Sequence, residues 1–240
     1  MSAHPDTDRA LSRRERERLM RREAIIEAAQ AVFAEKGYTN ATLDEIAHRA
    51  EFGKGTLYNY FEGGKEGILF ACFDEIYDDL CDTIETSFAP ERMQGRALRD
   101  VLRDFIADYF TYFQERRELF MIIMKEAYRM IFSDDPSRAA YFQEQRERVV
   151  SALVPALEAG RDAGEIRPLP THSVAHMVMG NVNGLMMHMM LEKECSADPL
   201  PDASVLDTPE EAADFLTTML FDGLQPSTAQ RDDSPTRHDE

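Results

Sequence analysis

The sequence lacks the features of a membrane-spanning or disulfide-linked secreted protein. No apolar run in its 240 residues approaches the roughly 20 residues that cross a bilayer, and the N-terminus has no apolar signal-peptide block. Its only cysteines, Cys72, Cys81 and Cys195, have no metal-ligand spacing, and Cys72 and Cys81 would lie on opposite sides of one helix. We therefore expect a soluble, cytoplasmic protein without membrane contact and with reduced thiols, a redox-sensing thiol being the alternative.

Strand patterns and catalytic motifs are also missing. From Arg96 onward, no segment shows the period-two alternation of β-branched residues that is typical of strands. No nucleophile with a base, glycine-rich phosphate loop or pair of buried carboxylates stands out. His172 and His176 have an i, i+4 spacing that can place two imidazoles on one metal, but the same turn offers no convincing third ligand. The sequence predicts an all-α protein that is not an enzyme, with surface histidines, no metal site and no cofactor.

The net charge of −18 is unevenly distributed along the chain. Residues 1–66 hold 11 Lys and Arg against 12 Asp and Glu, whereas residues 67–240 hold 16 against 33. Within the first part, the segment Arg9–Arg22 has seven arginines opposed by two glutamates. This basic segment either contacts DNA, at phosphates or in the minor groove, or is a solvated extension of the first helix. The sequence leaves both interpretations open.

Residues 42–61 predict two short helices joined by a tight, glycine-containing turn. Thr42 is placed to cap the first helix, and Leu57, Tyr60 and Phe61 of the second point back toward it. This is the pattern of a helix-turn-helix, whose second helix enters the DNA major groove. The outer side of the second helix offers groups suited to phosphates and base edges, while an ordinary polar helical hairpin is the alternative. These outer residues are Lys54, Gly55, Thr56, Tyr58 and Asn59.

Residues 26–69 resemble the N-terminal domain of the tetracycline-repressor (TetR) family of bacterial transcriptional regulators. The resemblance rests on Ile26, Ala28, Ala29, Phe33, Gly37, Tyr38, Thr42, Ile46, Ala47, Ala50, Gly55, Thr56, Leu57, Tyr58, Tyr60, Phe61, Lys65 and Glu66. The family usually has two residues between the Phe that ends the recognition helix and the following Lys, whereas this chain has Glu62, Gly63 and Gly64. The resemblance implies that Lys65 contacts a phosphate, and two glycines can absorb the extra residue. With it, the candidate DNA-binding set is Thr42, Lys54, Gly55, Thr56, Tyr58, Asn59, Tyr60 and Lys65.

Apolar periodicity predicts about nine helices in two domains. A disordered arm (1–13), a helix-turn-helix domain (14–70), a helical ligand-binding and dimerisation domain (71–224) and a disordered tail (225–240) follow one another. Gly37 should stop the first helix, residues 196–207 should form a loop, and Pro155 should kink or bound the segment 139–159. The resemblance implies that the long helix after Gly64 links the ligand and DNA sites.

The stretch from residue 105 to residue 128 is rich in aromatic and methionine side chains, which suit an adaptable apolar pocket. The TetR resemblance implies a small-molecule cavity in this domain, although each such residue can equally be plain core. Three carboxylates lie nearby, Asp104, Asp108 and Glu126. If they face the pocket, they favour a neutral or cationic apolar ligand; the alternative is that they belong to the solvated surface. The candidate ligand-binding set is Phe105, Tyr109, Tyr112, Phe113, Phe120, Met121, Met124 and Tyr128.

Residues 176–191 are rich in methionine and carry Gly180 and Gly184 on one helix face. The spacing allows another helix to approach closely, either from a second subunit or within the same chain. The resemblance implies that this helix and the last one form the dimer interface. We therefore expect a homodimeric repressor that binds an inverted-repeat operator in double-stranded DNA and is released by a small hydrophobic effector. The alternative is a helical ligand-binding or catalytic protein whose N-terminal helix pair serves protein contacts.

Overall fold

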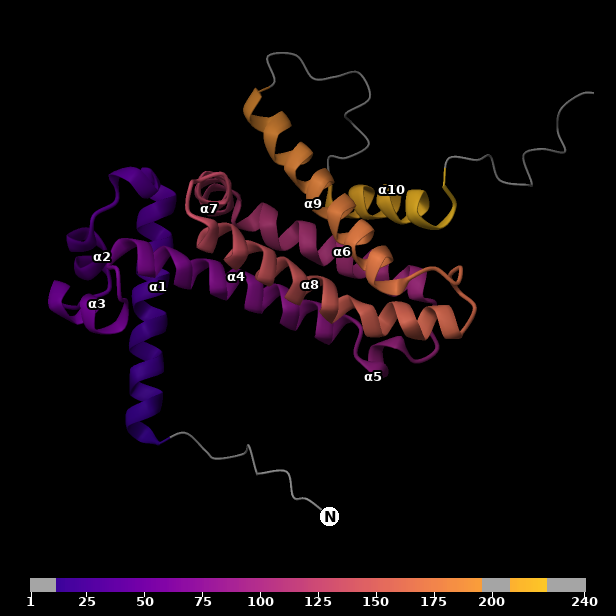
Figure 1. The fold of residues 1–240 in the computed structure, drawn as a ribbon, viewed down its shortest axis with the longest axis horizontal. Coiled ribbons are helices and arrows are strands. Elements are labelled where there is room, and N and C mark those ends of the chain that lie inside the picture. The colour runs from indigo at the N-terminus through magenta and orange to yellow at the C-terminus, as the bar shows by residue number, and fades with distance from the viewer. Residues whose placement is uncertain (1–11, 196–207, 224–240) are drawn as a thin grey trace, which may run out of the picture. The chain divides into compact units, whose positions relative to one another are not determined.

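The computed structural model describes residues 12–195 and 208–223, with side chains for 12–189 and 208–223, and contains only helices in these ranges (Figure 1). The predicted loop 196–207 and tail lie outside the described residues, as does most of the predicted arm. Ser12 and Arg13, which the arm was expected to include, instead cap and begin the first helix. The ten helices described are α1 (Arg13–Asn40), α2 (Leu43–Arg49), α3 (Lys54–Tyr60), α4 (Lys65–Ser87), α5 (Pro90–Met93), α6 (Leu98–Glu115), α7 (Arg117–Ile131), α8 (Pro136–Asp162), α9 (Thr171–Cys195) and α10 (Pro209–Phe221).

The all-α prediction is confirmed, and the one helix beyond the predicted nine is the four-residue α5. Contacts group the chain into two compact units. The first contains the residues up to Ile76 together with Glu118–Asp135, and the second contains Tyr77–Arg117 and the residues from Pro136 onward. Helix α4 is continuous across the division, and α7 belongs with the first unit, an assignment that the linear order of the helices did not suggest.

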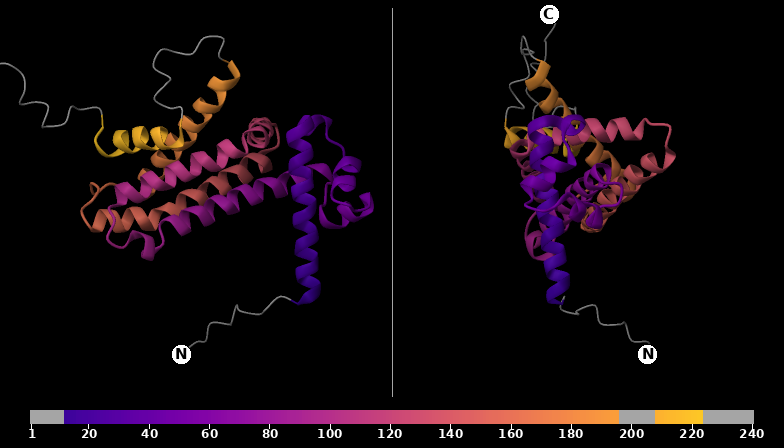
Figure 2. Two further views of the ribbon diagram at one scale, coloured as in Figure 1. Left: turned by 180° about the vertical axis from the view of Figure 1, so that it is seen from behind. Right: turned by 90° about the vertical axis from the view of Figure 1, so that its left-hand side faces the viewer.

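The first unit is built on α1, whose long regular part ends where Gly37 adopts φ 76°, a conformation that side-chain-bearing residues rarely adopt. The predicted stop at Gly37 is thus confirmed as a break in helical geometry. The left view of Figure 2 shows that α2 and α3 lie on the same side of α1. The core of the first unit comprises Ile25, Ile26, Ala29 and Phe33 of α1, Ile46 of α2, Leu57 of α3 and Ile68, Leu69 and Cys72 of α4.

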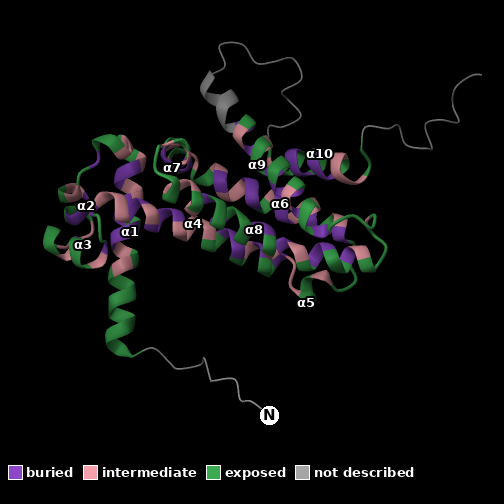
Figure 3. Cartoon of the chain, in the orientation of Figure 1, coloured by how far each residue is buried: buried purple, intermediate pink, exposed green. Residues whose placement is uncertain are grey.

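The second unit packs α10 along α6 and α9 along α8. Arg99 of α6 makes a bidentate ion pair with Asp222 at distances of 2.8 and 2.9 Å, and Arg103 pairs with Asp214 of α10. Gly160 lets α8 approach α6, because a Cβ there would stand 2.4 Å from Leu98 Cδ2. These contacts fix α6 between α8 and α10, and Figure 3 shows buried residues recurring along these three helices.

Helix α8 runs through Pro155 without ending there, so the alternative that Pro155 bounds a helix is wrong. The Pro155 side chain is exposed, so its ring projects toward solvent rather than into the core. Among the described helices, none combines the length and the apolar character that crossing a bilayer requires.

Candidate nucleic-acid interface and effector site

The beginning of α2 is fixed by a capping box. Thr42 Oγ1 accepts a hydrogen bond from the Glu45 backbone N–H at 3.3 Å, and Glu45 Oε2 accepts from the Thr42 backbone N–H at 3.0 Å. The Thr42 hydroxyl also donates to Glu45 Oε2 at 2.9 Å. Lys36, which donates to the same carboxylate at 2.6 Å, and Thr42 together lower the pKa of Glu45 to about 2. Thr42 therefore sets the position of α2, whatever else it contacts.

The turn between α2 and α3 closes through backbone hydrogen bonds. The Phe52 N–H donates to the Ala47 carbonyl at 2.9 Å, and Glu51 takes the left-handed position with φ 59°. The glycine of the turn, Gly53, instead has φ −73° and is the N-cap of α3, where it provides no side-chain cap. The predicted helix-turn-helix is present, but the residue in the left-handed region is Glu51.

Helix α3 separates an inward from an outward side. Leu57 is fully buried against the unit's core, while Tyr60 is half-buried. Lys54, Gly55, Tyr58 and Asn59 are exposed, with 54% of Tyr58 accessible, and Thr56 is half-buried. A Cβ at Gly55 would meet no atom within 4 Å, so packing within the described chain does not require glycine there. The polar side of α3 is thus available to a partner.

Lys54 is held in an ion pair with the preceding helix. Its Nζ donates to Asp44 Oδ2 at 2.9 Å, and this hydrogen bond raises the pKa of Lys54. Both side chains are well exposed. Exposed pairs of this kind are weak, so a phosphate oxygen can replace the Asp44 carboxylate as the partner of Lys54.

The three residues after Phe61 accommodate the insertion in the way the two glycines suggested. Gly63 has φ 82° and Gly64 has φ 63°, so both occupy the left-handed region. A Cβ on Gly64 would stand 3.1 Å from both Leu43 Cδ1 and Tyr58 Cε1. The reversal places the first turn of α4 close to the end of α3, and it also determines where Lys65 lies.

Lys65 binds the end of α1 rather than projecting as a free cation. Its Nζ donates to the carbonyl oxygens of Tyr38 at 2.8 Å, Thr39 at 3.3 Å and Ala41 at 2.8 Å. It also lies 4.6 Å from the centroid of the Tyr38 ring. The break at Gly37 leaves these carbonyls without partners in a continuing helix, and an ammonium group satisfies them. In the free chain the Lys65 ammonium is thus engaged with three carbonyls of its own unit, and the phosphate contact expected of it stays a prediction.

The basic segment before the helix-turn-helix is helical where it is described. Ser12 and Glu15 form a capping box at the start of α1, and the first turns of this helix are exposed (Figure 3). Arg13 pairs with Glu17 at 2.8 Å, and the Arg22 guanidinium lies 5.6 Å from the centroid of the Phe61 ring. The arginines up to Arg21 thus form part of a solvated helix and are accessible to phosphates, whereas Arg22 is half-buried.

Two family profiles match the chain, one over the helix-turn-helix and one over later helices. Residues 25–72 match the family described as bacterial regulatory proteins, tetR family, and residues 101–197 match the tetracyclin repressor-like C-terminal domain. The chain belongs to the TetR family. It is a DNA-binding transcriptional regulator with an N-terminal helix-turn-helix, and not an enzyme.

Two distant relatives match most of the chain. The HTH-type transcriptional regulator YhgD of Bacillus subtilis (strain 168) is 26% identical over 169 residues, covering 66% of this chain and 78% of the relative. The HTH-type transcriptional repressor DhaR of Mycobacterium sp. (strain GP1) is 23% identical over 217 residues, covering 86% and 93%.

Solved structures share the fold of this TetR-family chain. FadR from Bacillus subtilis, solved in complex with stearoyl-CoA, superposes with a TM-score of 0.67 at 20% identity, covering 85% of this chain and 99% of FadR. Salmonella enterica GusR superposes with a TM-score of 0.63 at 23% identity, covering 86% and 96%.

The eight residues of the candidate ligand-binding set are distributed over both units. Phe105, Tyr109, Tyr112 and Phe113 belong to the second unit, and Phe120, Met121, Met124 and Tyr128 belong with α7 to the first. In the second unit, Tyr109, Tyr112 and Phe113 line a cavity of about 10 Å³, together with Asp79, Leu80 and Thr83 of α4. Phe105 is fully buried in the core. The structure therefore brings three members of the set together at one cavity.

Polar contacts organise this cavity. The Tyr112 hydroxyl donates to Asp79 Oδ2 at 2.9 Å, and the buried Tyr109 hydroxyl donates to Asn183 Oδ1 of α9. Burial raises the pKa of Tyr109 well above its usual range, so its hydroxyl stays protonated. Asp79 and Asn183 were not among the candidate residues, because each lies on a different helix from the tyrosine that it contacts and no local motif points to it.

An open groove of about 400 Å³ adjoins the small cavity and shares Asp79, Thr83 and Tyr112 with it. Asp82, Asp108 and Arg92 also line the groove. Of the three carboxylates considered from sequence, Asp104 pairs with Arg96 at 2.6 Å and the buried Glu126 pairs with Arg129 at 2.6 Å. Only Asp108 contributes to the groove, where Asp79 and Asp82 add two further acidic groups.

Gly180 and Gly184 are both exposed on α9. A Cβ added at either would meet no atom within 4 Å, so no described part of the same chain packs closely there. This rules out, for the described residues, the alternative that the glycines admit an intrachain neighbour. Met177 on α9 and Phe215 on α10 are also accessible, with exposed fractions of 65% and 44%.

Cys72 and Cys81 are free and buried. Burial raises the pKa of both thiols, which keeps them protonated and weakly reactive. This agrees with the expected reduced thiols and disfavours a redox role for these two residues.

Proposed function

We propose that this TetR-family regulator is a homodimeric repressor that binds an inverted-repeat operator and is released by a hydrophobic, neutral or cationic effector. The observation that carries the DNA-binding part is the exposed polar side of α3, where Lys54, Tyr58 and Asn59 face away from the core. Amide and hydroxyl groups on a recognition helix read base edges, and lysine neutralises phosphates. One short helix covers few base pairs, so two copies related by two-fold symmetry supply the selectivity.

In this proposal, the Lys54–Asp44 ion pair opens when DNA binds and Lys54 turns to a phosphate. Replacing Asp44 by asparagine should therefore strengthen DNA binding, by up to about fivefold at physiological salt. The substitution frees Lys54 and removes one negative charge beside the phosphates. The logarithmic salt dependence of binding should become steeper by up to about one unit. Both quantities are measured by fluorescence anisotropy on a duplex selected from a random library by the wild-type protein.

The matched control is Glu35→Gln, which removes an exposed carboxylate from the Arg49–Glu35 pair in the same unit but leaves Lys54 and Asp44 untouched. Its effect on affinity should be smaller than that of Asp44→Asn. Weaker binding by Asp44→Asn would show that Lys54 does not approach a phosphate.

The effector part of the proposal rests on the second unit. Its aromatic cavity of about 10 Å³ is far below the roughly 300 Å³ that a small-molecule pocket needs. An effector entering from the acidic groove must therefore separate Leu80 and Thr83 of α4 from Tyr109 and Phe113 of α6. Because α4 is one continuous helix from Lys65 to Ser87, a movement near Leu80 and Thr83 is passed along it to its first turn, which directly follows the helix-turn-helix. A hundredfold loss of DNA affinity requires about 2.7 kcal/mol of differential effector binding.

The groove charges lead to a preference that a matched pair of probes can measure. Tetraphenylphosphonium and tetraphenylborate have nearly the same apolar shape and opposite charge. Because Asp79, Asp82 and Asp108 outnumber Arg92 at the groove, the cation should raise the melting temperature and lower operator affinity by at least about tenfold. The anion should do neither. Thermal shift and anisotropy on the selected duplex measure both responses.

The double variant Asp79→Asn/Asp108→Asn should reduce the response to the cation. Asp100→Asn, an exposed carboxylate on α6 outside the groove, should leave it unchanged. Stearoyl-CoA, which FadR from B. subtilis binds in its solved structure, is a further probe. A response to tetraphenylborate or stearoyl-CoA without one to the cation would contradict the charge preference but not the effector proposal itself.

A further inference from the structure

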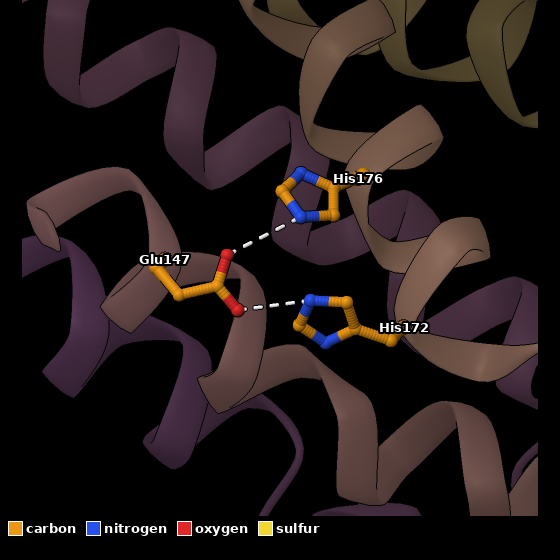
Figure 4. Close-up of side chains that lie close together, drawn as sticks. All are labelled: Glu147, His172 and His176. Carbon is orange, nitrogen blue, oxygen red and sulfur yellow. Dashed lines mark ion pairs between the residues drawn. The ribbon is translucent and has the colours of Figure 1, made fainter. Parts of the chain in front are cut away.

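Glu147, His172 and His176 bring three potential metal-ligand atoms together on the surface of the second unit (Figure 4). The two histidines lie on the first turns of α9, and Glu147 comes from the neighbouring helix α8. His172 Nε2 lies 2.9 Å from Glu147 Oε1, and His176 Nε2 lies 3.3 Å from Glu147 Oε2. The donor atoms all lie within 4.8 Å of one another. The sequence prediction of no metal site considered a third ligand on the same turn only, and α8 supplies one instead.

We propose that Glu147, His172 and His176 bind a divalent transition metal ion of the zinc class. Zinc bonds to imidazole nitrogen and carboxylate oxygen are about 2.0–2.2 Å long, so neighbouring donors around a tetrahedral ion lie about 3.3 Å apart. The separations between the carboxylate oxygens and the histidine nitrogens are already close to that value. Figure 4 shows the carboxylate turned toward both rings, so small side-chain rotations bring three donors onto one ion.

The donor chemistry selects the class of metal. Two imidazoles and one carboxylate suit Zn²⁺, Co²⁺, Ni²⁺ or Cu²⁺, whereas Mg²⁺ and Ca²⁺ prefer oxygen ligands throughout. The three side chains retain exposed fractions between 38% and 51%, which leaves room for water at a fourth position. The net charge of −17 over residues 67–240 adds a long-range attraction for cations.

A metal at this site joins the first turns of α9 to α8. The same helix carries Gly180 and Gly184 one to two turns further on. Bound metal thus ties the start of α9 to its neighbour and stabilises the folded second unit, because the unfolded chain does not hold the three donors together. This site is separate from the helix-turn-helix and from the aromatic cavity, and it does not depend on the proposed function.

The test uses untagged, metal-free full-length protein titrated with Zn²⁺ by calorimetry and with Co²⁺ by absorption spectroscopy. One ion should bind per chain, and the Co²⁺ spectrum should lack thiolate charge-transfer bands, since no cysteine is among the ligands. His172→Gln and Glu147→Gln should each weaken binding by at least about tenfold. Zn²⁺ at a hundredfold excess over its Kd should raise the melting temperature by roughly 5–10 °C, and a chelator should reverse the rise.

The matched control is His188→Gln, which removes an exposed histidine from the same helix outside the cluster and should bind Zn²⁺ like the wild type. Circular dichroism without metal should show the same fold for all variants, because the three substituted side chains, Glu147, His172 and His188, are exposed. The proposal is overturned if the wild type binds no Zn²⁺, if His172→Gln and Glu147→Gln bind as tightly as the wild type, or if His188→Gln loses binding equally.

Discussion

Replacing Lys65 by methionine is expected to destabilise the DNA-binding unit by about 2–4 kcal/mol, even without DNA. The substitution removes the ammonium that donates to three carbonyl oxygens at the end of α1 and leaves part-buried acceptors without their partner. It also removes the cation next to the Tyr38 ring. Urea unfolding followed by circular dichroism measures the loss. Hydrogen exchange should place the reduced protection at the end of α1 and the start of α4.

Lys54→Met is the matched control, since it is the same substitution at the lysine that begins α3. Lys54 is exposed and forms its ion pair with the exposed Asp44, so the stability of the free protein should hardly change. Its DNA affinity should fall, with a salt dependence that is flatter by about one unit. The opposite pattern would show that Lys65 contacts the phosphate. In that case Lys65→Met would keep its stability but bind DNA with a flatter salt dependence, and Lys54→Met would unfold.

The fold and the helix-turn-helix were accessible from sequence because their signals are local. Thr42 caps α2 and Gly37 breaks α1 through interactions within a few residues, and Leu57 marks the inner side of α3 by periodicity alone. The partner of Lys65 was not accessible in this way. Its acceptors are backbone carbonyls more than twenty residues earlier. Every residue has a backbone carbonyl, so the residue types at those positions do not indicate which carbonyl accepts the bond.

The residues at the proposed effector and metal sites could not be grouped from sequence either, because their grouping depends on how the helices pack. The aromatic stretch from Phe105 to Tyr128 is continuous in sequence, but α6 and α7 belong to different units, so proximity along the chain does not predict a shared pocket. Glu147 joins His172 and His176 only because α8 lies against α9. Which faces of two helices meet depends on tertiary packing, and a single sequence gives no pairwise signal for it.

Replacing Gly184 by arginine is expected to convert the proposed dimer into a monomer without damaging the fold of the chain. Gly184 lies within α9, and a Cβ there would meet no atom of the described chain within 4 Å. Arginine also has a higher helix propensity than glycine, by roughly 0.5–1 kcal/mol, so the isolated chain should be at least as helical. In a dimer in which a partner helix packs against this glycine, the long charged side chain would occupy the partner's place. Light scattering should then show half the wild-type mass.

DNA binding should fall with dimerisation, because the second half-site of an inverted repeat then has to be bound in a separate event. The gain from linking two half-sites is about 10²–10⁴, so operator affinity should drop by at least about a hundredfold. Ala159→Arg, the same new side chain at an exposed position of α8, should keep both the dimer and the affinity. A Gly184→Arg protein that remains dimeric and binds the operator like the wild type would place the interface on another surface. A monomer with wild-type affinity would instead show that one recognition helix suffices, and the inverted-repeat operator would have to be abandoned.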